Sequence, residues 1–165
     1  MKVTLNPAEI SLAESIAAKR NAENRKVGRR DGKVLKNSID IDVQGAKSEL
    51  AVSKALGLKW DGAFLSDELW KIWRNVGHDV QHLEVRSTKH QNGRLILHPD
   101  DADESPFILV LAHADPIFEL AGWHLGKDGK KDEWWADVGY GRPCFYVPRN
   151  KMNTMDSLLI APAIT

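Results

Sequence analysis

Three charged residues near the middle of the sequence have the types and spacing that metal and phosphate chemistry requires. Asp79 precedes an apolar, β-branched run in which Glu84 and Arg86 are two positions apart. Residues two apart on a β-strand point to the same side, so a carboxylate and a cation project together near a second carboxylate. Charge removed from water has to be paired or bound to a metal. The three side chains can therefore hold a divalent cation and bind a phosphate.

The spacing between the two carboxylates constrains the local structure. On one straight strand Asp79 and Glu84 would be about 16 Å apart, at about 3.3 Å per residue, and would face opposite sides. They can share a cation only if residues 80–82 form a tight turn. Strand parity places three other side chains on the opposite face of the sheet: Leu83, Val85 and Ser87.

A third carboxylate is predicted on a helix over residues 44–57. At about 100° per residue, the apolar positions of this segment gather on one face, and Glu49 lies at the margin of that face. We therefore expect its carboxylate to point toward the core. Lys47 and Lys54 are expected to point away from it, and Gly57 provides the C-terminal cap.

The remaining pattern predicts one α/β domain over residues 1–165, with a mixed, largely antiparallel central sheet flanked by helices. Asn6-Pro7-Ala8-Glu9 begins a helix that should extend to about Arg20. Residues 21–42 are polar and basic and should form a loop or arm. Residues 1–42 thus supply a helix and an arm, and residues 43–165 supply the core. Strands are expected at 83–88, 94–98, 107–112, 117–125, 133–138 and 144–147, with Asn92-Gly93 joining the first two as a hairpin, and a short helix is expected at 155–160.

Composition favours a water-soluble globular protein. The 165 residues are 42% hydrophobic and 28% charged, with a net charge of zero. No apolar run approaches the roughly 20 residues of a membrane helix, so no membrane partner is expected. The single cysteine, Cys144, suits a reducing compartment, and the cytoplasm is the expected location. The sequence leaves a homodimer open.

Charge is unevenly distributed along the chain. Residues 19–36 contain eight basic and two acidic residues, a pattern compatible with binding to a phosphate backbone or with a solvated surface segment. The candidate nucleic-acid contacts in this arm are Arg25, Lys26, Arg29 and Arg30. An acidic cluster is expected to form a solvated loop, with metal binding as the alternative: Asp100, Asp101, Asp103 and Glu104.

The order of helix glutamate, aspartate and E-x-R tripeptide resembles the PD-(D/E)xK nuclease superfamily, in the compact form found in phage and mobile-element proteins. The matching residues are Glu49 within Gly45-Ala46-Lys47-Ser48-Glu49-Leu50-Ala51, then Asp79, then Glu84-Val85-Arg86. The resemblance covers about residues 45–97 and implies a restriction-endonuclease-like core. It implies Mg²⁺ or Mn²⁺ bound by Asp79, Glu84 and the Val85 carbonyl, with Glu49 holding a metal-bound water.

The implied activity is metal-dependent hydrolysis of phosphodiester bonds in nucleic acid, with DNA favoured and the host cytoplasm as the location of a phage-encoded protein. The implied catalytic residues are Glu49, Asp79, Glu84 and Arg86. Arg86 stands where the family has lysine, and arginine can stabilise charge but cannot take up a proton. The alternative function is therefore a catalytically inactive module of the same fold that binds nucleic acid or protein.

Two purely structural interpretations also remain open. Glu84 and Arg86 can form a cross-strand ion-pair ladder, with Glu49 contacting solvent at its helix margin. His78 and His82, which flank Asp79, have a spacing that binds zinc on a helix. This segment is predicted to be turn and strand, so surface or hydrogen-bonded histidines are favoured.

Overall fold

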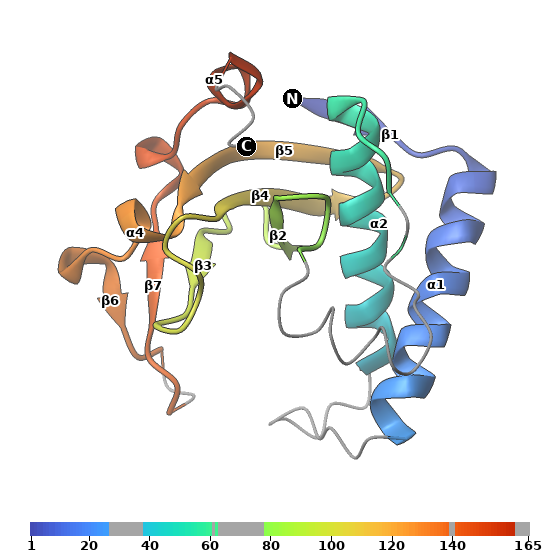
Figure 1. Ribbon diagram of the computed structural model, residues 1–165, viewed down its shortest axis with the longest axis horizontal. Helices are drawn as coiled ribbons and strands as arrows, with labels where there is room; N and C mark the ends of the chain where they lie inside the picture. Colours follow the sequence, from blue (N-terminus) through green and yellow to red (C-terminus); the bar gives the residue numbers. More distant parts are fainter. Residues whose placement is uncertain (27–37, 61, 63–77, 139–140, 161–165) are drawn as a thin grey trace.

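A four-stranded mixed sheet in the order β1-β5-β4-β2 forms the centre of the fold (Figure 1). The structure is a computed structural model that describes residues 1–26, 38–60, 62, 78–138 and 141–160. The strands are β1 (Lys2–Thr4), β2 (Glu84–Thr88), β4 (Pro106–Ala114) and β5 (Ile117–Leu125). β2 is parallel to β4, and the other two neighbouring pairs are antiparallel. The predicted α/β class, with a mixed, largely antiparallel sheet, is confirmed.

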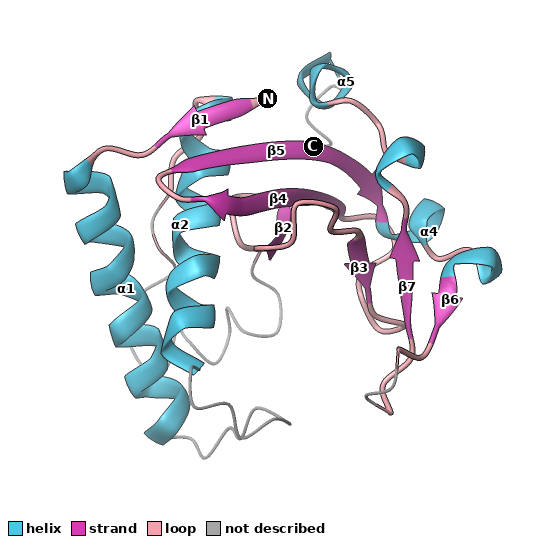
Figure 2. Ribbon diagram, turned by 180° about the vertical axis from the view of Figure 1, so that it is seen from behind, coloured by secondary structure: helices cyan, strands magenta, loops and turns pink. Residues whose placement is uncertain are grey.

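A second, antiparallel sheet contains β3 (Leu95–Leu97), β6 (Trp135–Ala136) and β7 (Cys144–Val147) in the order β3-β7-β6. The fold has the shape of an arch, in which β4 and β5 span the top and β2 lies between the two sides (Figures 1 and 2). Helices α1 and α2 form one side, and the second sheet forms the other. Short elements complete this second side and the C-terminal part: α4 (Gly126–Gly129), the 3-10 helices η1 (Asp132–Trp134) and η2 (Arg149–Lys151), and α5 (Met155–Ile160).

Both long helices extend further than their apolar spacing predicts. α1 covers Pro7–Lys26 and α2 covers Ser38–Leu56, so parts of the predicted polar arm at residues 21–26 and 38–42 are helical. The amide of Asn21 donates to Asp42 at 2.7 Å, and such polar contacts between helices are invisible to a search for apolar periodicity. The predicted start is confirmed, because Asn6 and Glu9 bond each other's backbone N–H at 2.7 and 2.9 Å. Within the described ranges, no helix is long and apolar enough to cross a membrane.

The alternation of side chains along β4 builds two cores. Ile108 and Val110 face α2 and pack with Val52, whereas the other face carries a second buried cluster. That cluster joins the central sheet to the second sheet: Leu95, Leu97, Phe107, Leu109, Leu111, Trp134 and Val147. The uninterrupted apolar run predicted for residues 107–112 thus belongs to a strand that is covered on both faces.

The predicted hairpin between residues 83–88 and 94–98 is wrong. A turn does form, because the N–H of Gly93 donates to the carbonyl of His90 at 2.9 Å. Beyond it, however, β3 pairs with β7, and β2 pairs with β4. Leu95 and Leu97 are fully buried in the second core, and this burial outweighs the local turn signal in deciding which strands pair.

Two further predictions are corrected by packing. Residues 133–138 were expected to form one strand, but η1 precedes the two-residue β6 and turns Trp134 into the core. Lys47 does not point into solvent: it is 8% exposed and pairs with Glu14 at 3.1 Å and Asp115 at 3.0 Å. The reason is that α1 packs beside α2 and covers the helix face that would otherwise be solvated.

A bulge in β5 lets this strand pass close to the C-terminal part of the chain. The register with β4 shifts so that Leu109 pairs with Gly122 and Val110 pairs with Leu120. Gly122 has a φ of 155°, and a Cβ added there would be 2.8 Å from the carbonyl oxygen of Asn153. This close approach of two backbones requires glycine.

We predict that Gly122→Ala lowers the free energy of unfolding by about 1–3 kcal/mol, because an unfavourable φ and a backbone contact add together. Urea denaturation measures the change. Gly45→Ala is the matched control: nothing lies within 4 Å of a Cβ at this position in α2, and alanine should stabilise the helix by about 0.5–1 kcal/mol. Similar changes at both glycines would contradict the assigned close approach.

Candidate metal and phosphate site

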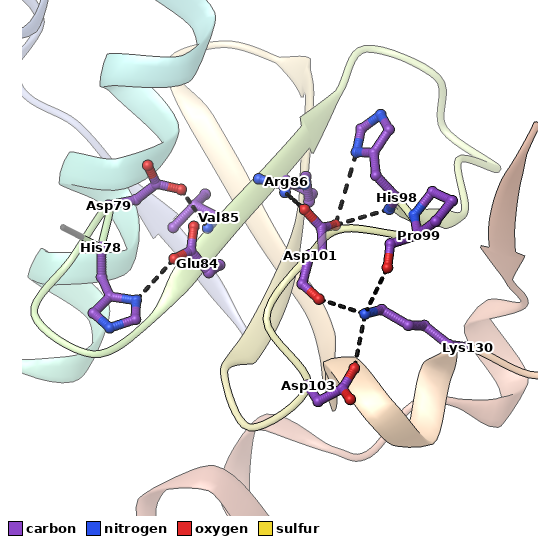
Figure 3. Close-up of polar contacts among 10 residues, drawn as sticks. All are labelled: His78, Asp79, Glu84, Val85, Arg86, His98, Pro99, Asp101, Asp103 and Lys130. Atoms are coloured by element: carbon purple, nitrogen blue, oxygen red, sulfur yellow. Dashed lines mark hydrogen bonds and ion pairs between the residues drawn. The ribbon is translucent and has the colours of Figure 1, made fainter. Parts of the chain in front are cut away.

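The tight turn that the sequence requires between the two carboxylates is present. Val80 and Leu83 exchange both backbone hydrogen bonds, at 3.1 and 2.9 Å, and Gln81 between them has a φ of 52°. The turn folds Asp79 back beside the start of β2, where its Oδ2 accepts the N–H of Val85 at 2.8 Å (Figure 3). Asp79 and Glu84, which are five positions apart in the sequence, are therefore neighbours in the structure.

Glu84 and Arg86 lie on one face of β2, as strand parity predicts. Their partners on β4 are Phe107 and Leu109, whose side chains belong to the second core. On the opposite face, Val85 packs against the core beneath α2, and the Ser87 hydroxyl accepts a hydrogen bond at 2.9 Å. Figure 3 shows the carboxylates of Asp79 and Glu84 close together at the start of the strand.

The surroundings of Asp79 change the ionisation of its carboxyl group. Burial first, and then the negative charge of Glu84, raise the pKa of Asp79 to about 6. The N–H of Val85 and the cations Arg86 and Arg20 act in the opposite direction. A divalent cation between Asp79 and Glu84 would remove this repulsion.

The available oxygen atoms fit magnesium or manganese. These hard cations accept one or two carboxylates and complete their coordination with waters and substrate phosphates. Asp79 and Glu84 supply two carboxylates, and one oxygen of Glu84 is 2.8 Å from Nδ1 of His78. Among the described residues, no group of three or more histidine, cysteine or acidic side chains is arranged to hold a metal.

Glu49 points inward, as helix phase predicts, but its carboxylate is held by an arginine. It is 6% exposed, and its two oxygens accept hydrogen bonds from Nη1 and Nη2 of Arg20 at 2.8 and 2.7 Å. Trp60 adds a third hydrogen bond at 3.1 Å. The interpretation of Glu49 as a solvent contact is therefore wrong.

Burial raises the pKa of Glu49, and the two bonds to Arg20 oppose this effect. The pKa of Arg20 is also raised: burial lowers it, and the hydrogen bond to Glu49 together with the negative charges of Glu49, Asp79 and Asp42 more than compensates. A true ion pair should lower the pKa of its acid, so the two directions conflict. We assign an ionised pair, because a guanidinium remains protonated and the contact is bidentate.

The charge of Glu49 also interacts with that of Asp79, which places the helix carboxylate within electrostatic reach of the turn. Its role in holding a metal-bound water stays a prediction, since both of its oxygens bind Arg20 in this arrangement.

Arg86 has one strong partner and one unused donor. Its Nη2 bonds Asp101 at 2.9 Å, and its guanidinium lies over the ring of Phe107 with 5.0 Å between Cζ and the ring centroid. Its Nε is buried and has no hydrogen-bond partner within the described part of the chain. Since Glu84 bonds His78 and Arg86 bonds Asp101, the two residues do not form the ion-pair ladder considered above.

The acidic cluster is neutralised by cations of the protein. Besides Arg86, Asp101 accepts the backbone N–H of His98 at 2.8 Å. Lys130 bonds the carbonyls of Pro99 and Asp101 and the carboxylate of Asp103 (Figure 3). This segment forms a braced loop that positions Arg86, and three of its carboxylates already have partners: Asp101, Asp103 and Glu104.

Arg20 is the residue near the site that sequence analysis missed. It was assigned to the basic arm, yet it follows Ala13 and Ala17 at helical spacing, and both are fully buried. A cation on a buried helix face requires a carboxylate, and this signal could have identified the pair with Glu49. Of the predicted nucleic-acid contacts, Arg29 and Arg30 lie outside the described residues, and Arg25 and Lys26 are placed only as the end of α1.

Comparison with known proteins adds no relative to this description. A scan against protein-family models, a search of curated proteins and a search of solved structures each found no match. The arguments about function therefore depend on the residues themselves.

We predict that Arg20→Met lowers the free energy of unfolding by about 3–5 kcal/mol, because it leaves Glu49 buried without its counterion. Adding Glu49→Leu should recover most of the loss, since the unpaired charge is then removed. Chemical denaturation of both variants measures this difference. Lys127→Met, which breaks an exposed pair with Glu104, is the control and should have little effect. Equal losses in the single and double variants would contradict the assignment.

The raised pKa of Asp79 predicts a pH dependence of stability. The folded state binds this proton more tightly than the unfolded state, so stability falls as pH rises from about 3.8 to about 6 and stays lower above that. Asp79→Asn keeps an acceptor for the Val85 N–H and removes the charge. It should raise the free energy of unfolding at pH 7–8 by about 1–3 kcal/mol and leave it little changed near pH 3.

Urea denaturation across pH 3–8 tests this, with Asp132→Asn as an exposed control. If Asp79→Asn left the free energy of unfolding unchanged or lowered it at pH 8, the ionised Asp79 carboxylate would not be destabilised by its surroundings.

Proposed function

We propose that the protein is a metal-dependent nuclease with a PD-(D/E)xK, restriction-endonuclease-like core. The observation that carries the proposal is the Asp79–Glu84 pair, brought together by the tight turn at the start of β2 and adjoining Arg86. Two carboxylates that repel each other beside an arginine with an unused donor are suited to a divalent cation and a phosphate.

In this proposal Asp79, Glu84 and the carbonyl of Val85 hold Mg²⁺ or Mn²⁺. When bound, the metal supplies a water of lowered pKa and neutralises charge on the phosphate. Arg86 donates to a phosphate oxygen, and Asp101 and Phe107 hold its guanidinium in place. Arg86 cannot take up the proton of the attacking water, so that proton has to leave by another acceptor.

Glu49 and Arg20 contribute from the helix side. The Arg20 guanidinium lowers the pKa of Asp79, which favours the ionised carboxylate that a metal requires. Glu49 fixes that guanidinium through two bonds, and Trp60 fixes Glu49. The predicted substrate is nucleic acid, with DNA favoured, and four basic residues would contact its backbone in the cytoplasm: Arg25, Lys26, Arg29 and Arg30.

One observation favours the alternative, a catalytically inactive module of the same fold. Arg86 and Glu49 each have a partner inside the protein, Asp101 and Arg20, so both side chains also have a structural role. The two functions differ in whether Asp79 and Glu84 bind a metal and whether a phosphodiester bond is cut.

Substitutions at the two β2 residues separate these functions. Arg86→Ala should reduce the rate of DNA cleavage roughly 10²-fold, the effect of losing one preorganised donor, and leave Mn²⁺ affinity nearly unchanged. Glu84→Ala should abolish both DNA cleavage and Mn²⁺ binding. Arg86→Lys should retain partial cleavage activity if any positive charge at this position is sufficient to stabilise the phosphate. The assays are cleavage of single- and double-stranded DNA and calorimetric titration with Mn²⁺. Arg149→Ala, which breaks a pair with Glu119 elsewhere, is the control.

Absence of cleavage by the wild type and by Arg86→Lys, with either Mg²⁺ or Mn²⁺ on both kinds of DNA, would rule out the nuclease. The inactive module would then be the accepted function.

A further inference from the structure

A hollow of about 380 Å³ lies beside the candidate site, between β2 and the second sheet. It begins at Arg86, so it adjoins the residues proposed to act on the phosphate. Its other lining residues include five from the end of β2, the turn that follows, β3 and β7: Thr88, His90, Arg94, Ile96 and Tyr146. Because Arg86 and its partner Leu109 line it, the hollow lies on the same face of β2 as Glu84.

The charge of the lining suits an anion. Two arginines, Arg86 and Arg94, and two histidines, His90 and His98, line the hollow, and no described carboxylate does. Asp101 contacts Arg86 and His98 from outside the lining and offsets part of this charge. Arg94 is exposed, and no hydrogen bond or ion pair joins it to another described residue. Its guanidinium is therefore available to a phosphate.

The opposite wall of the hollow is apolar and aromatic. Ile96 and Tyr146 are directly paired across β3 and β7, so their side chains share one face of the second sheet. Ile96 is 37% exposed, although it is a large aliphatic residue in a strand. A flat apolar ring placed against Ile96 would cover surface that otherwise contacts water. One wall of the hollow thus suits an anion and the other suits a flat ring, and a nucleotide contains both groups.

The volume of the hollow limits how large a ligand it can hold. A volume of 380 Å³ is within the range of small-molecule pockets, roughly 300–1,000 Å³. It can accept one nucleotide, whereas a paired base inside a duplex cannot enter. The nucleotide must therefore be unpaired.

We infer that this hollow binds one unpaired nucleotide of the strand whose phosphodiester bond is positioned at Asp79 and Glu84. The inference rests on the proposed function and specifies its substrate as single-stranded or locally unpaired nucleic acid. Arg94 and Arg86 bind the backbone phosphate, and Ile96 and Tyr146 contact the base. A duplex would have to open at this position, at the cost of unstacking a base.

Binding of a short, fluorescein-labelled oligothymidylate, measured by anisotropy in EDTA, tests this inference without cleavage. We expect it to bind more tightly than a duplex of the same length. Arg94→Gln and Ile96→Ser should each weaken binding about tenfold, the effect of one lost charged hydrogen bond or one lost base contact. Arg142→Gln is the matched control, because Arg142 is exposed and does not line the hollow. It should leave binding unchanged.

Equal or tighter binding of the duplex would overturn the inference. So would oligothymidylate binding that Arg94→Gln and Ile96→Ser leave unchanged. Either result would hold even if the protein cuts DNA. Conversely, the expected binding pattern without any metal-dependent cleavage would support the hollow and reject the nuclease, so the two failures can be distinguished.

Discussion

The structure depends on how it compensates two carboxylates placed side by side. Asp79 is partly buried next to Glu84, and burial first, then the negative charge of Glu84, raises its pKa to about 6. The Val85 N–H, Arg20 and Arg86 offset part of this repulsion, yet the pKa of Asp79 is still raised. The part of the repulsion that these groups do not offset favours binding of a proton or a metal ion at Asp79. The proposed site follows from this imbalance, because a divalent cation relieves it more completely than a proton on one oxygen.

One cation comes from the helix side and the other from β2 itself, and each cation is fixed by a partner of its own. On the helix side, Glu49 holds Arg20 through two hydrogen bonds. On the side of the second sheet, Asp101 holds Arg86, while Lys130 braces the loop that carries Asp101. The carboxylate pair at the start of β2 therefore has one cation from α1 and one from its own strand. The hollow next to Arg86 extends this positive region along the second sheet.

Strand parity, spacing and helix phase predicted much of the site, whereas the contacts that they did not predict come from segments distant in the sequence. Strand parity placed Glu84 and Arg86 on one face, the five-residue spacing required the turn at Val80–Leu83, and helix phase turned Glu49 inward. The partners of these residues, Arg20 and Asp101, come from distant segments, and no local pattern connects them. The hairpin prediction was wrong for the same reason. A turn signal at Asn92-Gly93 cannot show that β3 gains more by joining β7 in the second core.

The most direct test of the central claim is a crystal structure of the protein soaked with Mn²⁺, with anomalous data collected to locate the ion. The account predicts an anomalous peak bound by carboxylate oxygens of both Asp79 and Glu84, at a distance of about 2.0–2.2 Å. The Asp79→Asn variant should lose this peak under the same conditions. A wild-type crystal with no peak between these carboxylates, or with Mn²⁺ only at other residues, would contradict the account.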